Sequence, residues 1–247
     1  MRVLGVIPAR LGSTRLPNKP LQMLAGEPLI TRVVQRVQEH GLVDEWVVAT
    51  DSPAVADVVE RSGVRVVLTD PDHSTGTDRV AEVARRAEFS GFDAIVNVQG
   101  DEPFLEREAL AGAIARVARG DDVGTAAAPL DPALAGDPSR VKVVTDARGR
   151  ALYFSRAAIP HRRDPGGPSP GLYWQHLGLY AYTRDALRHW SSLEPCPAEL
   201  AERLEQLRAL HHGLRIGVAL LADPVEPGVD TPDDLRRAEA HWHALQR

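Results

Sequence analysis

The sequence predicts an α/β protein with a doubly wound, mostly parallel, Rossmann-like sheet and a small α+β subdomain at about residues 130–210. Short apolar runs alternate with stretches of helical periodicity in the first half of the chain, which is the rhythm of right-handed βαβ units. Polar loops follow three of those runs, as at the carboxyl ends of parallel strands. After residue 140 the pattern changes to that of a hairpin. A chain of 247 residues accommodates this as a single domain that includes the subdomain.

The elements of the first half follow from periodicity and end signals. An apolar run at residues 3–7 predicts a first strand, which Pro8 should end because proline cannot donate to a sheet ladder. Ser52 followed by Pro53 is typical of a helix start, and Thr77 is the expected cap of a helix over residues 78–89. The other expected elements are a helix at 27–40, strands at 46–49, 64–68 and 94–98, and a helix from about residue 106.

The second half of the chain lacks the regular alternation of strands and helices that the first half shows. Residues 141–145 and 151–154 predict a hairpin around the turn 146–149, and a proline- and glycine-rich loop follows at 160–171. A further strand is expected at 176–183. Residues 197–211 predict one helix with four leucines on one side, residues 214–221 return to the sheet, and a last helix has Pro232 in its first turn and ends near residue 246.

Composition limits the class of protein. The net charge of −5 argues against nucleic acid as the main partner. A single cysteine, Cys196, excludes an internal disulfide and fits a reducing compartment. The chain opens into a strand without a signal-peptide pattern, and no apolar run approaches the ~20 residues of a membrane span. We therefore expect a cytoplasmic protein with no membrane partner.

The loop after the first strand, within residues 6–21, carries the strongest chemical signal. Arg10, Arg15 and Lys19 surround Gly12 at a strand's carboxyl end, an arrangement that suits a polyphosphate, although the spacing is not the Walker pattern. The alternative is a solvated basic loop. Of the 29 lysines and arginines only Lys19 and Lys142 are lysines, which favours Lys19 as a phosphate contact because arginine's fork cannot replace a compact ammonium.

Two other strand ends attract functional hypotheses. Residues 70–79 form a hydroxyl-rich loop that is either part of a ligand site or an ordinary capping loop. Residues 99–103 place Gly100, Asp101 and Glu102 after a buried strand, which is typical of a metal–phosphate site. A charged helix N-terminus is the alternative for these acids, but it does not explain why Gly100 and Asp101 precede the helix.

Together these pieces resemble the 3-deoxy-manno-octulosonate cytidylyltransferase (CMP-Kdo synthetase) family of nucleotidyltransferases. The matching segments occur in the family's order along the whole chain: IPARLGSTRLPNKPL, STGTDR, VNVQGDEPF, VKVV, ALYFSRAAIP, HLGLYAY, LEQLRAL and GVDTPDDL. The resemblance implies Mg²⁺-dependent transfer of CMP from CTP to the anomeric hydroxyl of a 3-deoxy-2-ulosonic acid, with release of pyrophosphate, for lipopolysaccharide synthesis. It also implies a homodimer formed through the sugar-binding subdomain.

The resemblance further implies roles for individual residues. Those expected to be catalytic are Arg10, Arg15, Lys19 and Asp101. Those expected to bind the nucleotide are Arg10, Arg15, Lys19, Thr50, Asp51, Ser74, Gly76, Thr77, Arg79 and Gln99. The sugar acid would face Gln99, Arg156, His176, Tyr180, Glu205 and Gln206, and Asp101 with Asp230 would hold the metal.

Physical reading agrees with most of these roles and leaves some alternatives open. Asp101 and Asp230 each end an apolar run and precede a helix, so one sheet edge could bring them together. Arg156 suits a carboxylate because its fork binds bidentately. His176 and Tyr180 could instead be packing residues, and Glu205 could face solvent.

Related activities differ from this expectation in the substrate or in the chemistry. An acylneuraminate cytidylyltransferase usually has an opening loop closer to GGSKG than to LGSTRLP, and an amino analogue of the sugar acid is another candidate substrate. Sugar-1-phosphate nucleotidyltransferases favour a more glycine-rich opening loop. A non-catalytic nucleotide-binding regulator has less need of a second metal ligand, and a glycosyltransferase would have to use Asp70 and Asp72 for its metal.

Overall fold

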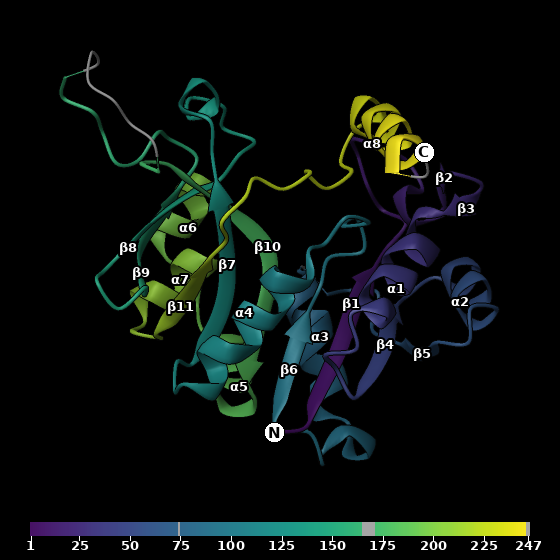
Figure 1. Ribbon diagram of the computed structural model, residues 1–247. Coiled ribbons are helices and arrows are strands. Elements are labelled where there is room, and N and C mark those ends of the chain that lie inside the picture. The colour runs from purple at the N-terminus through teal and green to yellow at the C-terminus, as the bar shows by residue number, and fades with distance from the viewer. Residues whose placement is uncertain (74, 165–170, 246–247) are drawn as a thin grey trace. The chain divides into compact units, whose positions relative to one another are not determined.

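The computed structural model describes residues 1–73, 75–164 and 171–245 and forms two compact units (Figure 1). The first unit contains residues 1–107 and 225–247, and the second contains residues 108–224. The subdomain expected at about residues 130–210 falls within the second unit. Among the described residues, no helix combines the length and the apolar character needed to cross a bilayer.

The first unit is built on a parallel sheet whose strand order is β6-β1-β4-β5. Its strands are β1 (Val3–Ala9), β4 (Glu45–Thr50), β5 (Arg65–Leu68) and β6 (Ala94–Asn97), and β2 (Met23–Leu24) and β3 (Glu27–Pro28) form a separate antiparallel pair. Its helices are α1 (Leu29–Glu39), α2 (Pro53–Glu60), α3 (Gly76–Arg85), α8 (Pro232–Leu245) and the 3₁₀ helices η1 (Lys19–Leu21) and η2 (Ala87–Phe89).

This strand order creates a topological switch point between β1 and β6. The chain moves outward from β1 to β4 and β5, then returns past β1 to form β6. Right-handed crossovers therefore place α3 on the opposite face of the sheet from α1 and α2. Ligands of doubly wound sheets bind at the carboxyl ends of the strands beside such a point, so the loops after β1 and β6 mark the expected site.

The first strand runs further than the sequence predicted. Pro8 lies inside β1, opposite Ala49 of β4. The main-chain oxygen of Val6 accepts from Val98, so Val6, and Pro8 two residues later, present their main-chain groups to the β6 side. The register with β6 ends at Val6. Pro8 therefore removes no ladder hydrogen bond there, and the prediction that it ends the strand was wrong.

Helix caps follow local chemistry with one correction. Ser52 caps α2, since its hydroxyl accepts from the Val55 amide, as its position before proline predicted. The cap of α3 is Thr75, whose hydroxyl accepts from the Asp78 amide. Thr77, the expected cap, is a buried residue of the first turn instead, so that prediction was wrong by two residues.

The second unit has a mixed sheet. Its strands are β7 (Val123–Pro129), β8 (Lys142–Thr145), β9 (Ala151–Ser155), β10 (Trp174–Thr183) and β11 (Ile216–Leu220). β10 is antiparallel to β7, β11 is parallel to β7, and β8 and β9 form the expected hairpin. The remaining helices are α4 (Arg107–Ala118), α5 (Arg184–Trp190), α6 (Pro197–Glu202), α7 (Gln206–His211) and the 3₁₀ helix η3 (Pro132–Leu134).

The helix predicted over residues 197–211 is two helices, α6 and α7. Arg203 adopts a left-handed conformation with φ of 54°, which ends α6 and turns the chain. The break lets Leu204 and Leu207 reach the core, whereas Leu200 is 58% exposed. A leucine pattern alone could not reveal this turn, because Arg203 is neither glycine nor proline.

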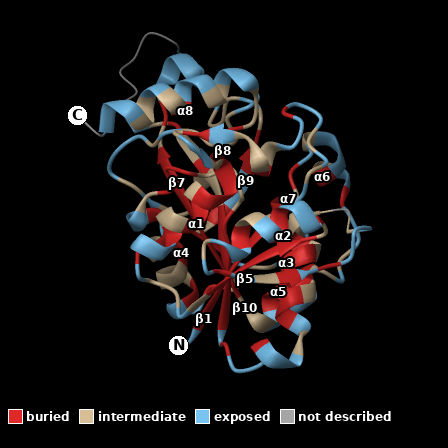
Figure 2. Ribbon diagram, turned by 90° about the vertical axis from the view of Figure 1, so that its right-hand side faces the viewer, coloured by how far each residue is buried: buried red, intermediate tan, exposed pale blue. Residues whose placement is uncertain are grey.

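Buried residues concentrate in the strands and on the inner faces of the helices, while much of α8 is exposed (Figure 2). In the first unit, one cluster matters for the site. Leu24 of β2, Leu29 of α1, Phe104 and Val229 pack together with Ala238 of α8. This cluster fixes the segment that leads into α8, and Asp230 belongs to that segment.

Candidate active site

The loop after β1 carries the predicted cations to one place. Asn18 takes a left-handed conformation and starts η1, whose second residue, Pro20, is buried. This turn directs Lys19 back toward the end of β6. The Lys19 side chain is only 17% exposed, whereas that of Arg15 is 62% exposed. Arg10 is exposed and lines the cavity described below.

The loop after β6 lies directly against β1. A Cβ added to Gly100 would lie 3.1 Å from the carbonyl oxygen of Pro8 and 3.3 Å from the side chain of Ile30, so glycine permits this close approach. The sequence anticipated a role for Gly100 outside the following helix. The consequence is that Asp101 is held at the switch point.

A third segment comes from the far end of the chain. The Val229 amide donates to the carbonyl oxygen of Asp101 over 2.8 Å, and the Val229 side chain is fully buried. The Asp234 carboxylate accepts from the amide and the hydroxyl of Thr231 and so fixes the entry to α8. Asp230, between these two anchors, is therefore placed beside Asp101.

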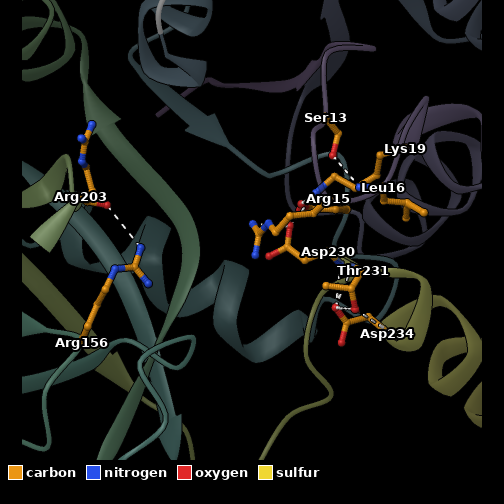
Figure 3. A network of polar contacts seen from close by, with 10 residues as sticks. Ser13, Arg15, Leu16, Lys19, Arg156, Arg203, Asp230, Thr231 and Asp234 are labelled. Carbon is orange, nitrogen blue, oxygen red and sulfur yellow. Dashed lines mark hydrogen bonds and ion pairs between the residues drawn. The ribbon is translucent and has the colours of Figure 1, made fainter.

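The three segments meet in one ion-pair network, of which Figure 3 labels Arg15, Lys19 and Asp230. The Lys19 ammonium donates to Asp101 and, over 2.9 Å, to Asp230. The Arg15 guanidinium also lies 3.0 Å from the Asp230 carboxylate. The expectation that one sheet edge brings Asp101 and Asp230 together is confirmed.

The pKa shifts show how charge is balanced in this network. Burial raises the pKa of the Asp101 carboxyl, and the charge of Lys19 opposes that rise. Burial and the charges of Asp101 and Asp230 raise the pKa of Glu102 to about 8. Burial lowers the pKa of Lys19, but its two carboxylate partners outweigh burial and raise it. One partly buried ammonium is thus surrounded by an excess of carboxylate groups.

This donor set fits a divalent cation. Mg²⁺ is commonly bound in proteins by one or two carboxylates, together with substrate phosphates and water. Asp101 and Asp230 supply two carboxylates that already share one cation, the Lys19 ammonium. The ammonium therefore marks a position where positive charge is favourable.

A cavity of about 210 Å³ opens beside the network. Six residues predicted from the sequence line it: Arg10, Lys19, Gly76, Arg79, Gln99 and Asp101. The remaining lining residues are Pro8, Ala9, Gly12, Ser13, Pro20, His73, Thr75 and Gly100. The cavity thus combines the loops after β1 and β6 with the start of α3, as expected for a ligand at the switch point.

One lining residue, the buried Arg79, links the cavity to the ends of β4 and β5. Arg79 is 2% exposed, donates to the Thr69 hydroxyl and lies 3.7 Å from the Asp51 carboxylate. Thr50 is fully buried at the end of β4. Thr50, Asp51, Thr77, Arg15 and Asp230 are not among the lining residues, and Ser74 lies outside the described residues.

His73 is a cavity residue that the sequence analysis did not single out. Its Nε2 lies 2.7 Å from the Glu82 carboxylate, which also accepts from the Asp70 amide over 2.9 Å and from Arg86 over 2.8 Å. Glu82 therefore ties the loop after β5 to α3. The spacing of residues 73 and 82 gives no sign of this pair.

We predict that Glu82→Gln destabilises the protein by about 1–3 kcal/mol at pH 7. Burial raises the pKa of Glu82, but hydrogen bonds from Arg86, Asp70 and His73 outweigh it and lower the pKa from 4.5 to about 2. A depressed pKa stabilises the fold above pH 4.5, and this contribution is lost as the pH falls toward 2. Urea unfolding at pH 7 and pH 4 should show a smaller difference from wild type at pH 4. The exposed Glu60→Gln variant is the control, and a pH-independent difference would contradict the assignment.

In the second unit, Arg156 follows β9 and is held by main-chain carbonyls. Its guanidinium donates to Glu202 over 2.7 Å, to Pro138 over 2.9 Å and to Arg203 over 3.4 Å, the last visible in Figure 3. Its amide donates to the Glu202 carboxylate. Each terminal nitrogen of the guanidinium keeps one further N–H for a ligand.

His176 and Tyr180 lie together on β10, with ring centres 5.4 Å apart. Burial lowers the pKa of His176 to about 3, so its imidazole is neutral. The Thr125 hydroxyl donates to the Leu179 carbonyl over 2.7 Å and lies 3.0 Å from the Nε2 atom of His176. That hydroxyl has a single proton, so when it donates to Leu179, Nε2 carries the imidazole proton and Nδ1 is left as an acceptor.

Glu205 and Gln206 lie at the start of α7, two to three residues after the Arg203 turn. Gln206 is 4% exposed, and the charge of Glu205 contributes, after burial and the charge of Tyr182, to the raised pKa of Tyr180. Arg208 of the same helix donates to the Glu199 carboxylate over 2.5 Å and 2.8 Å. The five predicted sugar residues of this unit therefore gather around β9, β10 and the α6–α7 turn, and Gln99 belongs to the first unit.

Comparisons with known proteins agree with this geometry. A sequence model of the family described as Cytidylyltransferase matches residues 4–216. The chain is 56% identical to the 3-deoxy-manno-octulosonate cytidylyltransferase of Gemmatimonas aurantiaca over 99% of this chain and 96% of that protein. It is 49% identical to the enzyme of the same description from Methylococcus capsulatus, over 96% of this chain and 95% of that protein.

A solved structure extends the match to three dimensions. The structure of a CMP:2-keto-3-deoxy-manno-octonic acid synthetase complexed with CTP is 38% identical to this chain and superposes with a TM-score of 0.92. The match covers 99% of this chain and 100% of the other. By sequence and by fold, the chain belongs to the 3-deoxy-manno-octulosonate cytidylyltransferase family.

Proposed function

We propose that this protein transfers CMP from CTP to the anomeric hydroxyl of 3-deoxy-D-manno-octulosonate (Kdo), giving CMP-Kdo and pyrophosphate for lipopolysaccharide synthesis. The observation that supports it best is the meeting of Lys19, Asp101 and Asp230 at the switch point of the sheet, beside a cavity lined by Arg10 and Gln99. Full-length similarity to enzymes of that description names the nucleotide and the sugar acid.

In the proposed reaction, the anomeric oxygen forms a bond to the α-phosphorus of CTP. The bond between that phosphorus and the bridging oxygen to the β-phosphate breaks, and pyrophosphate leaves with the electron pair while the hydroxyl proton passes to solvent. Arg10, Arg15 and Lys19 would bind the phosphate chain and neutralise the leaving group. Asp101 and Asp230 would hold Mg²⁺, which when bound supplies charge neutralisation at the α-phosphate.

The nucleoside would occupy the wall formed by the start of α3. We assign Gly76, Thr77, Arg79, Thr50 and Asp51 to this side, together with Ser74. Gly76 and Arg79 line the cavity, and the buried Arg79 orders the ends of β4 and β5 through Asp51 and Thr69. Thr50, Asp51 and Thr77 would act by shaping this wall.

The sugar acid would meet the residues of the second unit. The two remaining N–H groups of Arg156 suit its carboxylate. The neutral imidazole of His176 offers an acceptor for a hydroxyl, and Tyr180, Glu205 and Gln206 offer further polar groups nearby. Gln99 would contact the nucleotide, the sugar or both from the end of β6.

We also propose a cytoplasmic homodimer that uses the second unit. Strand β9 pairs with β8 and presents Leu152, 63% exposed, and Tyr153, 38% exposed. Exposed apolar side chains on a strand suit contact with a second copy. The free and buried Cys196 fits a reducing compartment. Light scattering coupled to size exclusion checks the dimer.

A substrate panel tests the activity. Pyrophosphate release would be measured with Kdo, its amino analogue and N-acetylneuraminate, each with CTP and with UTP, and again with EDTA. We expect release with CTP and Kdo that EDTA abolishes and Mg²⁺ restores. Preference for another sugar acid would reassign the substrate, and CTP binding without release would indicate a regulator.

A further inference from the structure

Lys142, the second of the two lysines, has no exposed surface. It begins β8, and its ammonium donates to three main-chain carbonyls: those of Asp137 over 2.9 Å, Arg140 over 2.5 Å and Arg156 over 2.6 Å. An ammonium has three protons, so all of them are used. Burial lowers the pKa of Lys142, and the charges of Asp137 and Glu202 oppose that fall.

This site requires an ammonium. Three carbonyl oxygens around one nitrogen match a compact donor with three protons, whereas a planar guanidinium directs its donors as a fork. Arginine accounts for all cationic positions of the chain except residues 19 and 142. The two lysines, Lys19 and Lys142, are thus the residues whose ammonium groups bind two or more oxygen atoms in the structure.

The three carbonyls belong to segments that also contact Arg156. Lys142 joins the loop 137–140 to the main chain of Arg156, and the guanidinium of Arg156 returns to the same loop through the Pro138 carbonyl. Arg140 of this loop donates in turn to Gln175 over 2.7 Å. The His176 amide donates to the Val141 carbonyl over 2.8 Å, next to Lys142 in sequence.

Arg156 is therefore held from both ends. Its main chain is fixed by Lys142 and Glu202, and three of its guanidinium N–H groups are fixed by carbonyls. These contacts fix the orientation of the Arg156 side chain, and that orientation sets the direction of its two remaining N–H groups. Loss of the ammonium would release the loop 137–140 and with it one of the guanidinium's acceptors.

We propose that Lys142 is a positioning residue for the sugar acid: its buried ammonium fixes Arg156 and the loop 137–140 in the arrangement that presents the Arg156 fork to the substrate carboxylate. This inference rests on the proposed function. Because Lys142 has no exposed surface and all its protons are used, it acts through Arg156 and does not touch the substrate.

The test compares Michaelis constants for the two substrates. Lys142→Gln keeps a similar volume and two donors, so it should fold, and Lys142→Met removes every donor. We expect the KM for Kdo to rise about 10-fold or more in both variants, since small displacements of a positioning group are costly. The KM for CTP should stay within about twofold of wild type.

A second measurement separates positioning from stability. In an Arg156→Met background, Lys142→Gln should raise the KM for Kdo no further, because its effect passes through Arg156. Asp121→Asn is the matched control in the same unit: it removes a buried charge paired with Arg116 and Arg150. It should lower the melting temperature and leave the KM for Kdo unchanged.

The outcomes are distinct. A wild-type enzyme that does not use Kdo refutes the proposed function before any variant is made. With an active wild type, a folded Lys142→Gln enzyme with an unchanged KM for Kdo, or an equal rise in both KM values, overturns the inference. Additive effects with Arg156→Met overturn it as well. Failure of both Lys142 variants to fold, with Asp121→Asn folded, would assign Lys142 to stability alone.

Discussion

Asp101→Asn is expected to lower turnover by about 10²–10³-fold while the protein stays folded, because it removes one preorganised charge from the reaction centre. Asp101 contacts Lys19 and lies beside Asp230. The amide keeps the shape of the carboxylate but loses half of the charge that the two aspartates offer to a divalent cation. Weaker metal binding and a misdirected Lys19 should therefore appear together.

The fold should tolerate this change for an electrostatic reason. Burial raises the pKa of Asp101, the charge of Lys19 opposes that rise, and the negative charge of Asp230 adds to it. Neutralising one member relieves repulsion among the others and offsets the lost ion pair with Lys19. We expect a melting temperature close to that of wild type.

The measurement is kcat from pyrophosphate release at saturating CTP and Kdo, with thermal unfolding alongside. Asp93→Asn is the matched control, because Asp93 precedes β6 at its amino end as Asp101 follows it at the carboxyl end. Asp93 is exposed and accepts from the Arg2 amide. Turnover near the wild-type value in Asp101→Asn would remove Asp101 from the mechanism.

The fold was predictable where the signal is local. Alternation of apolar runs with helical periodicity identified β1, β4, β5 and β6 and the helices between them, because each such element buries one face. Strand β7 gave no signal, since three of its seven residues are alanines in a row, and alanine is not a strand former. The turn at Arg203 was also invisible, because a left-handed arginine is fixed by tertiary contacts.

The residues of the site likewise fall into those that the sequence predicted and those that it could not predict. The rule that ligands bind at strand ends pointed to the loops of Lys19 and Asp101, whereas Asp230 came from the family resemblance, and the structure brings all three together. Sequence spacing could not predict the contact between His73 and Glu82, nor the main-chain carbonyls that bind the Lys142 ammonium. Both sets of contacts depend on how the loops pack. The scarcity of lysine was the one compositional clue to Lys142, and it could not name its partners.

Lys19→Met should lower kcat/KM for CTP by about 10²–10³-fold and, in the same protein, strengthen divalent metal binding without nucleotide. The ammonium of Lys19 contacts both Asp101 and Asp230, so it competes with a divalent cation for the same oxygens. Methionine fills the space without charge. The variant thus loses a phosphate contact and, at the same time, frees two carboxylates whose mutual repulsion a cation relieves.

Mn²⁺ titration followed by electron paramagnetic resonance measures the metal affinity separately from activity. The variant should bind Mn²⁺ at least about 10-fold more tightly than wild type, which corresponds to roughly 1.4 kcal/mol. Arg15→Met is the control, because Arg15 contacts Asp230 from a side chain that is 62% exposed and screened by solvent, so its removal should change Mn²⁺ affinity much less. Equal affinities in wild type and Lys19→Met would show that the ammonium does not compete with metal, and Lys19 would then act on the nucleotide phosphates alone. A combined loss of CTP use and gain of Mn²⁺ affinity would instead mean that nucleotide binding, by drawing Lys19 onto the phosphates, prepares the aspartate pair for its metal.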